Sequence, residues 1–271
     1  MNFNLLEDFN ENTAPPSFHR CLKGCNEMRV IARLDVKNGH VIKGIHLEGL
    51  RKVGDPSDLA QKYYLEDIDE IFFMDAVASL YDRNGLFDII SKSCERVFVP
   101  ITVGGGIRSL DDVEQALAAG ADKVAVNSAA VRNLGLISEI AKRYGSQCIV
   151  GSIEAMRRDG AWEAYIDNGR EPTDLNVVNW VKRLEDSGVG EIMLTSVDFE
   201  GTFRGYDLDL VFAVQDATCS PVVVSGGFGR IEHLSKMFGS SQPSGVVIAG
   251  ALHYNKVSIA CIKDAVLNNL A

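Results

Sequence analysis

The chain has 271 residues, 46% of them hydrophobic, with a formal net charge of −10 at pH 7 and a pI near 5.0. This acidic balance argues against a nucleic-acid partner, because binding to a phosphate backbone needs a basic face. No run approaches the ~20 apolar residues of a membrane-spanning helix, so a membrane partner is not expected. Small phosphorylated ligands are not excluded, since backbone N–H groups hold phosphate without a net positive charge.

The first 28 residues are polar and acidic, and they contain Pro15-Pro16. They lack the basic start and apolar core of a signal peptide. We predict that residues 1–28 are a flexible extension and that residues 29–271 form one domain. Four of the six cysteines lie in or beside apolar runs, which predicts buried thiols in a reducing, cytoplasmic compartment: Cys94, Cys148, Cys219 and Cys261.

From Arg29 onward, short apolar runs alternate with segments of helical period. The apolar runs predict buried parallel strands: Val30–Leu34, Glu70–Met74, Pro100–Val103, Lys123–Val126, Cys148–Ile153, Glu191–Thr195, Val222–Val224 and Val246–Ile248. The intervening segments predict helices, among them Ser57–Leu65, Leu110–Ala118, Asn133–Tyr144 and Leu175–Ser187.

Local signals refine this pattern. Ser109 and Asp174 precede two of the helices and are predicted to cap them. Hairpin-like pieces follow the first and fifth strands, at Gly39–Gly44 and Gly160–Ile166. Eight strand–helix units with no linker of changed composition predict a single (β/α)8 TIM barrel, with a doubly wound open sheet as the competing layout.

The two halves of the chain repeat each other. Val99–Gly106 aligns with Ser220–Gly227, and Glu70–Phe73 aligns with Glu191–Leu194 at the same offset. Such a half-barrel repeat favours the closed barrel over an open sheet. Apolar runs that end in Gly, Asn or Ser are typical of strands whose ends hold anions on backbone N–H groups. Two such cradles predict one elongated substrate with a phosphate at each end.

Chemistry in such barrels lies at the C-terminal ends of the strands. Asp35 ends the first predicted strand and Glu154 follows the fifth, so the two carboxylates are expected on opposite sides of the ring. Opposed carboxylates can act as general acid and general base when their environments separate their pKa values. We predict Asp35 and Glu154 as the catalytic pair.

At these residues the chain resembles the cyclase subunits of imidazole glycerol phosphate synthase, from histidine biosynthesis. The resemblance extends from Arg29 to about Asn255. The motifs that carry it are Ile31–Lys37, Val41–Gly44, Gly54–Pro56, Thr102–Ile107, Gly120–Val124, Asn127–Val131, Gly145–Gln147, Glu200–Thr202, Gly205–Asp207 and Ser225–Gly227.

The resemblance implies a reaction and a partner. Ammonia from a glutaminase subunit would convert a bis-phosphate phosphoribulosyl aminoimidazole carboxamide ribonucleotide into imidazole glycerol phosphate and aminoimidazole carboxamide ribonucleotide. The two chains would form a heterodimer, with no metal and no organic cofactor implied. No Cys-His-Glu glutaminase triad is evident in this chain, so the ammonia must come from another protein.

The resemblance also assigns binding residues. One phosphate would rest on Gly106, Asn127 and Ser128, and Lys43 would lie on a mobile loop over the substrate. The other phosphate would rest on four further residues: Gly201, Gly227, Ala249 and Gly250. A ring of charges at the N-terminal face would mark the ammonia entrance and the docking face for the partner: Arg29, Glu70, Lys123 and Glu191.

The departures from the family gather around the reacting centre. Glu154 and Glu200 stand where the family has Asp, Met156 replaces a Lys, and Arg33 replaces a small residue such as Cys. Because alternate strand residues share a face, Arg33 is predicted to point inward, one layer below Asp35. An inward cation would lower the pKa of Asp35 and pair with it or with Glu154.

These departures leave three functions open. In the first, the chain is a working cyclase. In the second, it is a paralogue that uses ammonia to form an amidine group on a surface sugar. The third is a catalytically inactive barrel that binds a glutaminase. The isomerase of the same pathway shares the barrel and the opposed acids, but the charged entrance argues against it.

Overall fold

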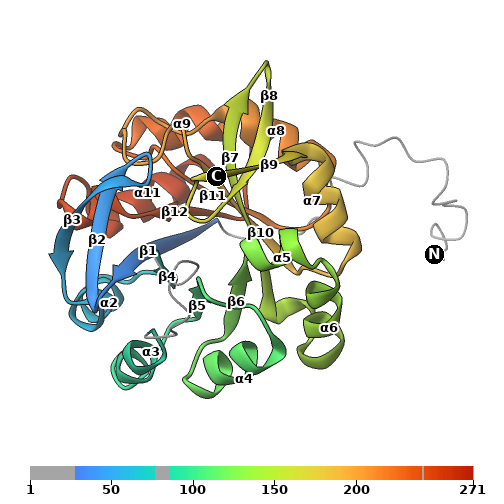
Figure 1. Cartoon of the computed structure of the whole chain (residues 1–271). Coiled ribbons are helices and arrows are strands. Elements are labelled where there is room, and N and C mark those ends of the chain that lie inside the picture. Colours follow the sequence, from blue (N-terminus) through green and yellow to red (C-terminus); the bar gives the residue numbers. More distant parts are fainter. Residues whose placement is uncertain (1–27, 77–85, 240, 271) are drawn as a thin grey trace, which may run out of the picture.

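The computed structural model describes residues 28–76, 86–239 and 241–270. Parallel strands close into a barrel through the pairing of β7 with β10 and of β12 with β1 (Figure 1). In ring order these strands are β1 (Arg29–Lys37), β4 (Glu70–Asp75), β5 (Ile101–Gly104), β6 (Lys123–Val126), β7 (Ile149–Arg158), β10 (Glu191–Ser196), β11 (Val222–Ser225) and β12 (Gly245–Ile248). The predicted (β/α)8 barrel is therefore confirmed.

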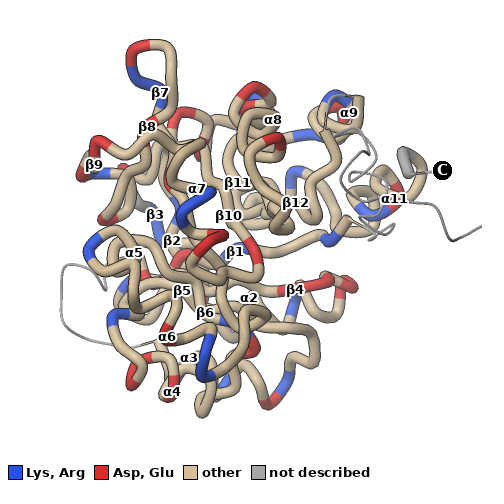
Figure 2. Tube along the Cα trace, turned by 90° about the vertical axis from the view of Figure 1, so that its right-hand side faces the viewer, with Lys and Arg blue, Asp and Glu red and all other residues tan. Residues whose placement is uncertain are grey.

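Helices surround the ring and cover its outer face. They are α2 (Pro56–Leu65), α3 (Phe87–Cys94), α4 (Leu110–Ala118), α5 (Ser128–Arg132), α6 (Gly135–Tyr144), α7 (Val177–Asp186), α8 (Leu208–Ala217), α9 (Glu232–Phe238), α10 (Gly250–His253) and α11 (Ile259–Leu270), with a 3-10 turn at Ser146–Cys148. Acidic and basic residues are both scattered over many of these elements (Figure 2). None of the helices in the described ranges is long and apolar enough to cross a membrane.

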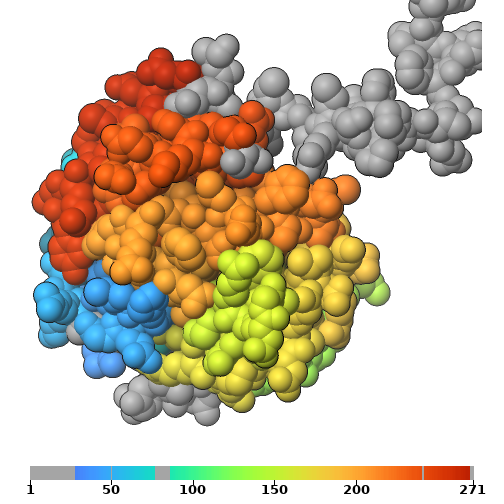
Figure 3. Space-filling model, turned by 90° about the horizontal axis from the view of Figure 1, so that it is seen from above, coloured from blue at the N-terminus to red at the C-terminus, as the bar shows by residue number. Residues whose placement is uncertain are grey.

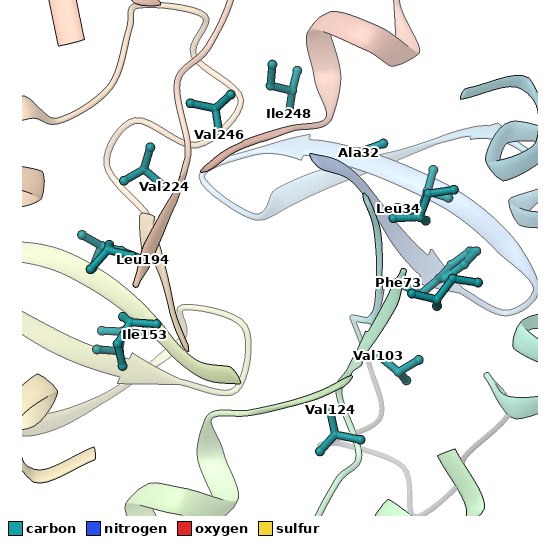
Figure 4. Close-up of a cluster of buried hydrophobic side chains, with 14 of the residues drawn as sticks. Ala32, Leu34, Phe73, Val103, Val124, Ile153, Leu194, Val224, Val246 and Ile248 are labelled. Carbon is teal, nitrogen blue, oxygen red and sulfur yellow. The ribbon is translucent and has the colours of Figure 1, made fainter. Parts of the chain in front are cut away.

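The alternation of side chains along each strand divides the core into two parts. Val30, Ala32 and Leu34 of β1 belong to the large outer cluster, which packs between strands and helices. Figure 4 shows residues of this cluster on the outer side of the ring. The second cluster fills the inside of the barrel and takes one or two residues from most strands: Ile31, Phe72, Met74, Ala125, Val150, Met193, Val223 and Val247.

Two antiparallel hairpins rise from the first and fifth strands of the ring, where the sequence predicts them. β2 (His40–Ile45) pairs with β1 and β3 (Glu48–Gly54), and β8 (Ala161–Ile166) pairs with β7 and β9 (Glu171–Asn176). Neither β3 nor β9 is predicted from the sequence. The first hairpin (blue) lies against the segment around residue 200 (orange) in Figure 3, and His46 N–H donates a 2.8 Å hydrogen bond to Glu200 O.

The internal repeat is confirmed in matched hydrogen bonds. Ile71 N–H donates to Pro100 O at 3.0 Å, and Ile192 N–H donates to Pro221 O at 2.8 Å. In each half a short helix follows the fourth strand and precedes a longer one: α5 before α6 after β6, and α10 before α11 after β12. The sequence repeat therefore corresponds to two half-barrels of the same design.

Three local predictions meet different outcomes. Ser109 caps α4 as predicted, because its side chain accepts a hydrogen bond from Asp112 N–H. The predicted cap at Asp174 is wrong: Asp174 lies in β9, and Asn176 caps α7 by accepting from Asn179 N–H at 3.2 Å. The predicted burial of the thiols is wrong for Cys219 and Cys261, which are exposed, while Cys94 and Cys148 are half-buried.

Most of the predicted extension, residues 1–27, lies outside the described residues. Met28, at its end, is buried in the outer core cluster.

Candidate active site

Two buried carboxylates lie on opposite sides of the barrel at its C-terminal end. Asp35 is on β1 and Glu154 is on β7, and three strands separate these two in either direction around the ring. Their exposed fractions are 6% and 4%. The structure thus places both of the predicted carboxylates, buried, at the same end of the barrel, facing each other across the ring.

Asp35 is held between two cations. Its Oδ1 accepts a hydrogen bond from Arg33 Nε at 2.7 Å, and its Oδ2 lies 3.4 Å from Lys43 Nζ. Burial alone would raise the pKa of Asp35, but the charges of Arg33 and Lys43 outweigh burial and lower this pKa below its ordinary value. Asp35 is therefore an ionised carboxylate throughout the neutral pH range.

Arg33 points into the barrel, one layer below Asp35, as strand alternation predicts. Its side chain is only 1% exposed. Nη1 donates to Thr195 Oγ1 at 3.3 Å, whereas Nη2 has no hydrogen-bond partner. The positive charge of the guanidinium interacts most strongly with the carboxylate of Asp35, and more weakly with those of Glu200 and Glu154. The predicted ion pair between Arg33 and Asp35 is confirmed.

Lys43 lies in strand β2 rather than in a loop, and it is buried. Its Nζ forms an ion pair with Glu200 as well as with Asp35. Glu200 accepts the same ammonium that Asp35 faces, so the two cations Arg33 and Lys43 alternate with two carboxylates. This alternation offsets the free-energy cost of burying four charged side chains at the C-terminal end of the barrel.

Glu154 has a different environment. Its Oε2 accepts hydrogen bonds from Asn127 Nδ2 at 3.1 Å and from Gly169 N–H at 2.8 Å. Burial raises the pKa of Glu154 to about 7, and the nearby charges of Asp35 and Asp167 act in the same direction, against Arg33 and the Gly169 N–H. One carboxylate is thus ionised and the other carries a proton up to about neutral pH, which is the division that acid–base catalysis needs.

The raised pKa of Glu154 has a consequence for stability. A carboxyl group whose pKa is higher in the folded state binds protons more tightly when folded, so the fold loses stability as pH rises from about 4.5 to 7. We expect Glu154→Gln to remove this loss and to be more stable than wild type by about 3 kcal/mol at pH 8. Urea unfolding at pH 4 and pH 8 measures the free energy of unfolding of both proteins. Wild type and Glu154→Gln should differ little at pH 4, and an equal difference at both pH values would contradict the raised pKa of Glu154.

The first predicted cradle opens into a cavity of about 210 Å³. Gly106, Asn127 and Ser128 all line this cavity, together with Glu154. Gly106 follows Gly105, and both have positive φ, at 78° and 85°. A side chain at Gly105 would collide with Asp75 O, so this turn requires glycine. The side-chain amide of Asn127 donates to Glu154 Oε2 and to Tyr165 O.

The second predicted cradle is formed by Gly201, Gly227, Ala249 and Gly250, and it is packed more closely. A Cβ at Gly227 would overlap Gly205 O, whereas one at Gly250 would meet the Phe203 ring at 3.0 Å. Phe203 therefore covers the start of α10. Lys43 is near the same point, since its Cε would lie 3.8 Å from a Cβ at Gly250. The second cradle thus adjoins Asp35 and Glu200 through Lys43.

Four charged residues meet at the opposite, N-terminal end of the barrel. Each is the first residue of its strand: Arg29, Glu70, Lys123 and Glu191. Arg29 forms ion pairs with both glutamates, and Lys123 Nζ lies 3.0 Å from a carboxylate oxygen of each. We call this closed set the charged ring. It lies below the inner apolar cluster, which separates it from Asp35 and Glu154.

The structure adds residues to the site that sequence reasoning missed. Arg132 lines the first cavity, and Thr195 binds Arg33. Asp167 accepts from Ser128 Oγ at 3.0 Å. The cue for Asp167 is local, because Asn168-Gly169 is a typical hairpin turn. Within the described ranges, no cluster of three or more His, Cys, Asp or Glu side chains is arranged to hold a metal ion.

Comparison with known proteins gives a consistent result. The model of the family described as "Histidine biosynthesis protein" matches residues 29–258. Imidazole glycerol phosphate synthase subunit HisF of Legionella pneumophila is 55% identical over 211 residues, covering 78% of this chain and 100% of the relative. The subunits HisF of Myxococcus xanthus and Methanopyrus kandleri are 45% and 43% identical, each covering 87% of this chain and 93% and 94% of the relative.

Proposed function

The chain belongs to the histidine biosynthesis protein family, and on that premise we propose that it is the cyclase subunit of imidazole glycerol phosphate synthase. It uses ammonia to convert the bis-phosphate phosphoribulosyl aminoimidazole carboxamide ribonucleotide into imidazole glycerol phosphate and aminoimidazole carboxamide ribonucleotide. The observation that carries this function is the pair of opposed, buried carboxylates with separated pKa values.

The two carboxylates divide the proton transfers between them. Ionised Asp35 accepts a proton from the nitrogen as ammonia adds to the substrate carbonyl, and it stabilises the positive charge that develops there. Protonated Glu154 donates one proton to the carbonyl oxygen, and Asp35 returns to it the proton taken from nitrogen, so that the oxygen leaves as water. Glu154 then recovers a proton from the nitrogen of the resulting iminium ion. Arg33 and Lys43 keep Asp35 ionised and fix its orientation.

We assign the two phosphates of the substrate to the two cradles. One phosphate is held on Gly106, Asn127 and Ser128, with Arg132 at the edge of the cavity. The other is held at the second cradle, beside Lys43. The first cradle follows β5 and β6, and the second follows β10, β11 and β12, in opposite halves of the ring. An elongated substrate bound at both ends therefore passes between Asp35 and Glu154.

Ammonia is delivered by a glutaminase partner at the N-terminal face. The charged ring closes this end of the barrel, and it leads to the inner apolar cluster. Two large apolar side chains are strongly exposed at the same face: Leu65 at the end of α2, at 73%, and Phe98 before β5, at 74%. Exposed apolar side chains beside a charged centre are typical of a protein–protein interface.

A variant of the charged ring tests this entrance. In Lys123→Met, Glu70 and Glu191 face each other with Arg29 alone between them. We expect glutamine-dependent turnover by the assembled complex to fall by about tenfold, equivalent to ~1.4 kcal/mol, while turnover with ammonium salt is unchanged. The exposed Lys142→Met is the matched control. Equal losses in both assays would assign Lys123 to the stability of the barrel instead.

The function itself is tested by supplying the purified chain with the bis-phosphate substrate and ammonium salt, which bypasses the partner. Formation of aminoimidazole carboxamide ribonucleotide is the expected result. Binding without turnover would contradict the cyclase assignment and indicate an inactive barrel or an enzyme with another ammonia acceptor. The buried Arg33–Asp35 pair is the feature in which such a paralogue would differ from the family.

A further inference from the structure

A carboxylate of this chain binds one member of the first phosphate cradle and the arginine at the edge of its cavity. Asp167 lies in the turn between β8 and β9, and its two carboxylate oxygens reach Ser128 and Arg132. Oδ1 accepts from Ser128 Oγ at 3.0 Å, and Oδ2 accepts from Arg132 Nη2 at 3.0 Å. Ser128 Oγ in turn accepts from Asp167 N–H at 3.2 Å. The Asp167 side chain is 14% exposed and the Arg132 side chain 54% exposed.

The same turn also holds Glu154. Gly169, two residues after Asp167, donates its N–H to Glu154 Oε2 at 2.8 Å. Asp167 and Gly169 both have positive φ, at 53° and 73°, so the turn has a specific backbone shape rather than an extended one. The backbone of the turn is tied to Ser128 as well, through the Asp167 N–H, so a movement of Asp167 away from Ser128 that breaks this bond would also move the Gly169 N–H relative to Glu154.

We propose that the Asp167 carboxylate takes the place of a substrate phosphate on Ser128 and Arg132, and that the incoming phosphate displaces it and thereby releases Glu154 from Gly169. Asp167 and Gly169 are then positioning residues, which act on the reaction through Glu154. The proposal rests on the proposed function, because it takes the first cradle as a phosphate site.

Charge explains why the two anions exclude each other. Ser128 has one O–H to donate, and the carboxylate and the phosphate compete for it and for the same guanidinium. Two anions at one site also repel each other. Loss of the Gly169 N–H removes a hydrogen bond that favours the ionised form of Glu154, so the displaced turn favours the proton that this residue donates. Binding of phosphate in the first cradle is in this way coupled to protonation of Glu154.

Binding of inorganic phosphate tests the first half of the proposal without any turnover. We expect Asp167→Asn to bind phosphate about fivefold more tightly than wild type by titration calorimetry, because a neutral amide competes less well for Arg132. Glu171→Gln is the matched control: it removes the same charge, and Glu171 lies 4.0 Å from the same Arg132 nitrogen but does not contact Ser128. An equal gain in both variants, or no gain in Asp167→Asn, would overturn the proposal.

Hydrogen exchange at Gly169 tests the second half. A bound ligand ordinarily slows amide exchange around its site, but here phosphate breaks the Gly169–Glu154 hydrogen bond, so exchange at Gly169 should become several-fold faster. Unchanged or slower exchange would overturn the coupling. With the bis-phosphate substrate, Asp167→Asn should lower KM by a larger factor than it changes kcat, a split that a merely structural role would not produce. If the cyclase assay failed, the phosphate titration and the hydrogen-exchange measurement would still test the displacement of Asp167. The proposed function and this further proposal can therefore be contradicted separately.

Discussion

Asp35→Asn should lower ammonium-dependent turnover by about 10²- to 10⁴-fold, the range that a positioned acid–base group contributes. The amide keeps the size of the side chain and the hydrogen bond from Arg33 but can neither accept a proton nor oppose positive charge. Steady-state formation of aminoimidazole carboxamide ribonucleotide at saturating substrate measures the effect. A folded Asp35→Asn protein with full turnover would show that Asp35 is not the catalytic carboxylate.

A loss of activity in this variant has to be separated from a loss of stability. Without the Asp35 charge, the guanidinium of Arg33 is left buried with less compensation, and breaking a buried ion pair costs about 3–5 kcal/mol. The double variant Arg33→Met/Asp35→Asn removes both charges and should regain most of the stability while staying inactive. Asp209→Asn, at an exposed acid on α8, is the control for the change of Asp to Asn in general.

The fold and the positions of Arg33 and Asp35 were predictable because they depend on patterns that strands impose. Alternation along β1 places Arg29, Arg33 and Asp35 on one face, and the structure shows Arg33 inside the barrel and bound to Asp35. The internal repeat likewise predicts two matched half-barrels. Both signals are properties of the backbone period and do not depend on which side chains meet across the molecule.

The β9 strand was not predictable in the same way. Its residues, Glu171–Asn176, are mostly exposed and polar, with no apolar alternation to distinguish a strand from a helix start. Asp174 therefore resembled a helix cap. In the structure Asp174 lies in β9 beside an irregularity in its pairing with β8, its N–H donates to the Glu163 carboxylate at 2.8 Å, and Asn176 takes the capping position. Tertiary pairing decided between two local preferences of similar strength.

The contents of the cradles could not be read from the sequence either. Glycines predict where a backbone can approach an anion, but they do not predict which side chains from distant segments contact the cradle. Asp167 binds Ser128 across a separation of 39 residues, and the Phe203 ring lies against Gly250. Each contact depends on how a turn is directed in space, which composition and period do not encode.

The rate of the wild-type chain should depend on the protonation of Glu154. With Glu154 as the proposed acid, kcat/KM is expected to be highest when this residue is protonated and to fall as pH rises through about 7. More of the ammonium becomes ammonia as pH rises, so rates must be expressed per concentration of free ammonia. A rate that rises through pH 7 after this correction would assign Glu154 as a base instead.

Glu154→Gln should remove this pH dependence and lower turnover by about 10²- to 10⁴-fold, because the amide has no acidic proton to donate. Glu154→Asp is the conservative comparison: it restores an acid but withdraws the carboxyl from Asn127 and Gly169, and a displacement near ~1 Å can cost up to about a hundredfold. We therefore expect Glu154→Asp to lie between wild type and Glu154→Gln in rate and to keep a titrating limb. If Glu154→Gln and Glu154→Asp were equally slow and equally insensitive to pH, Glu154 would position Asn127 and the turn at Gly169 rather than transfer a proton.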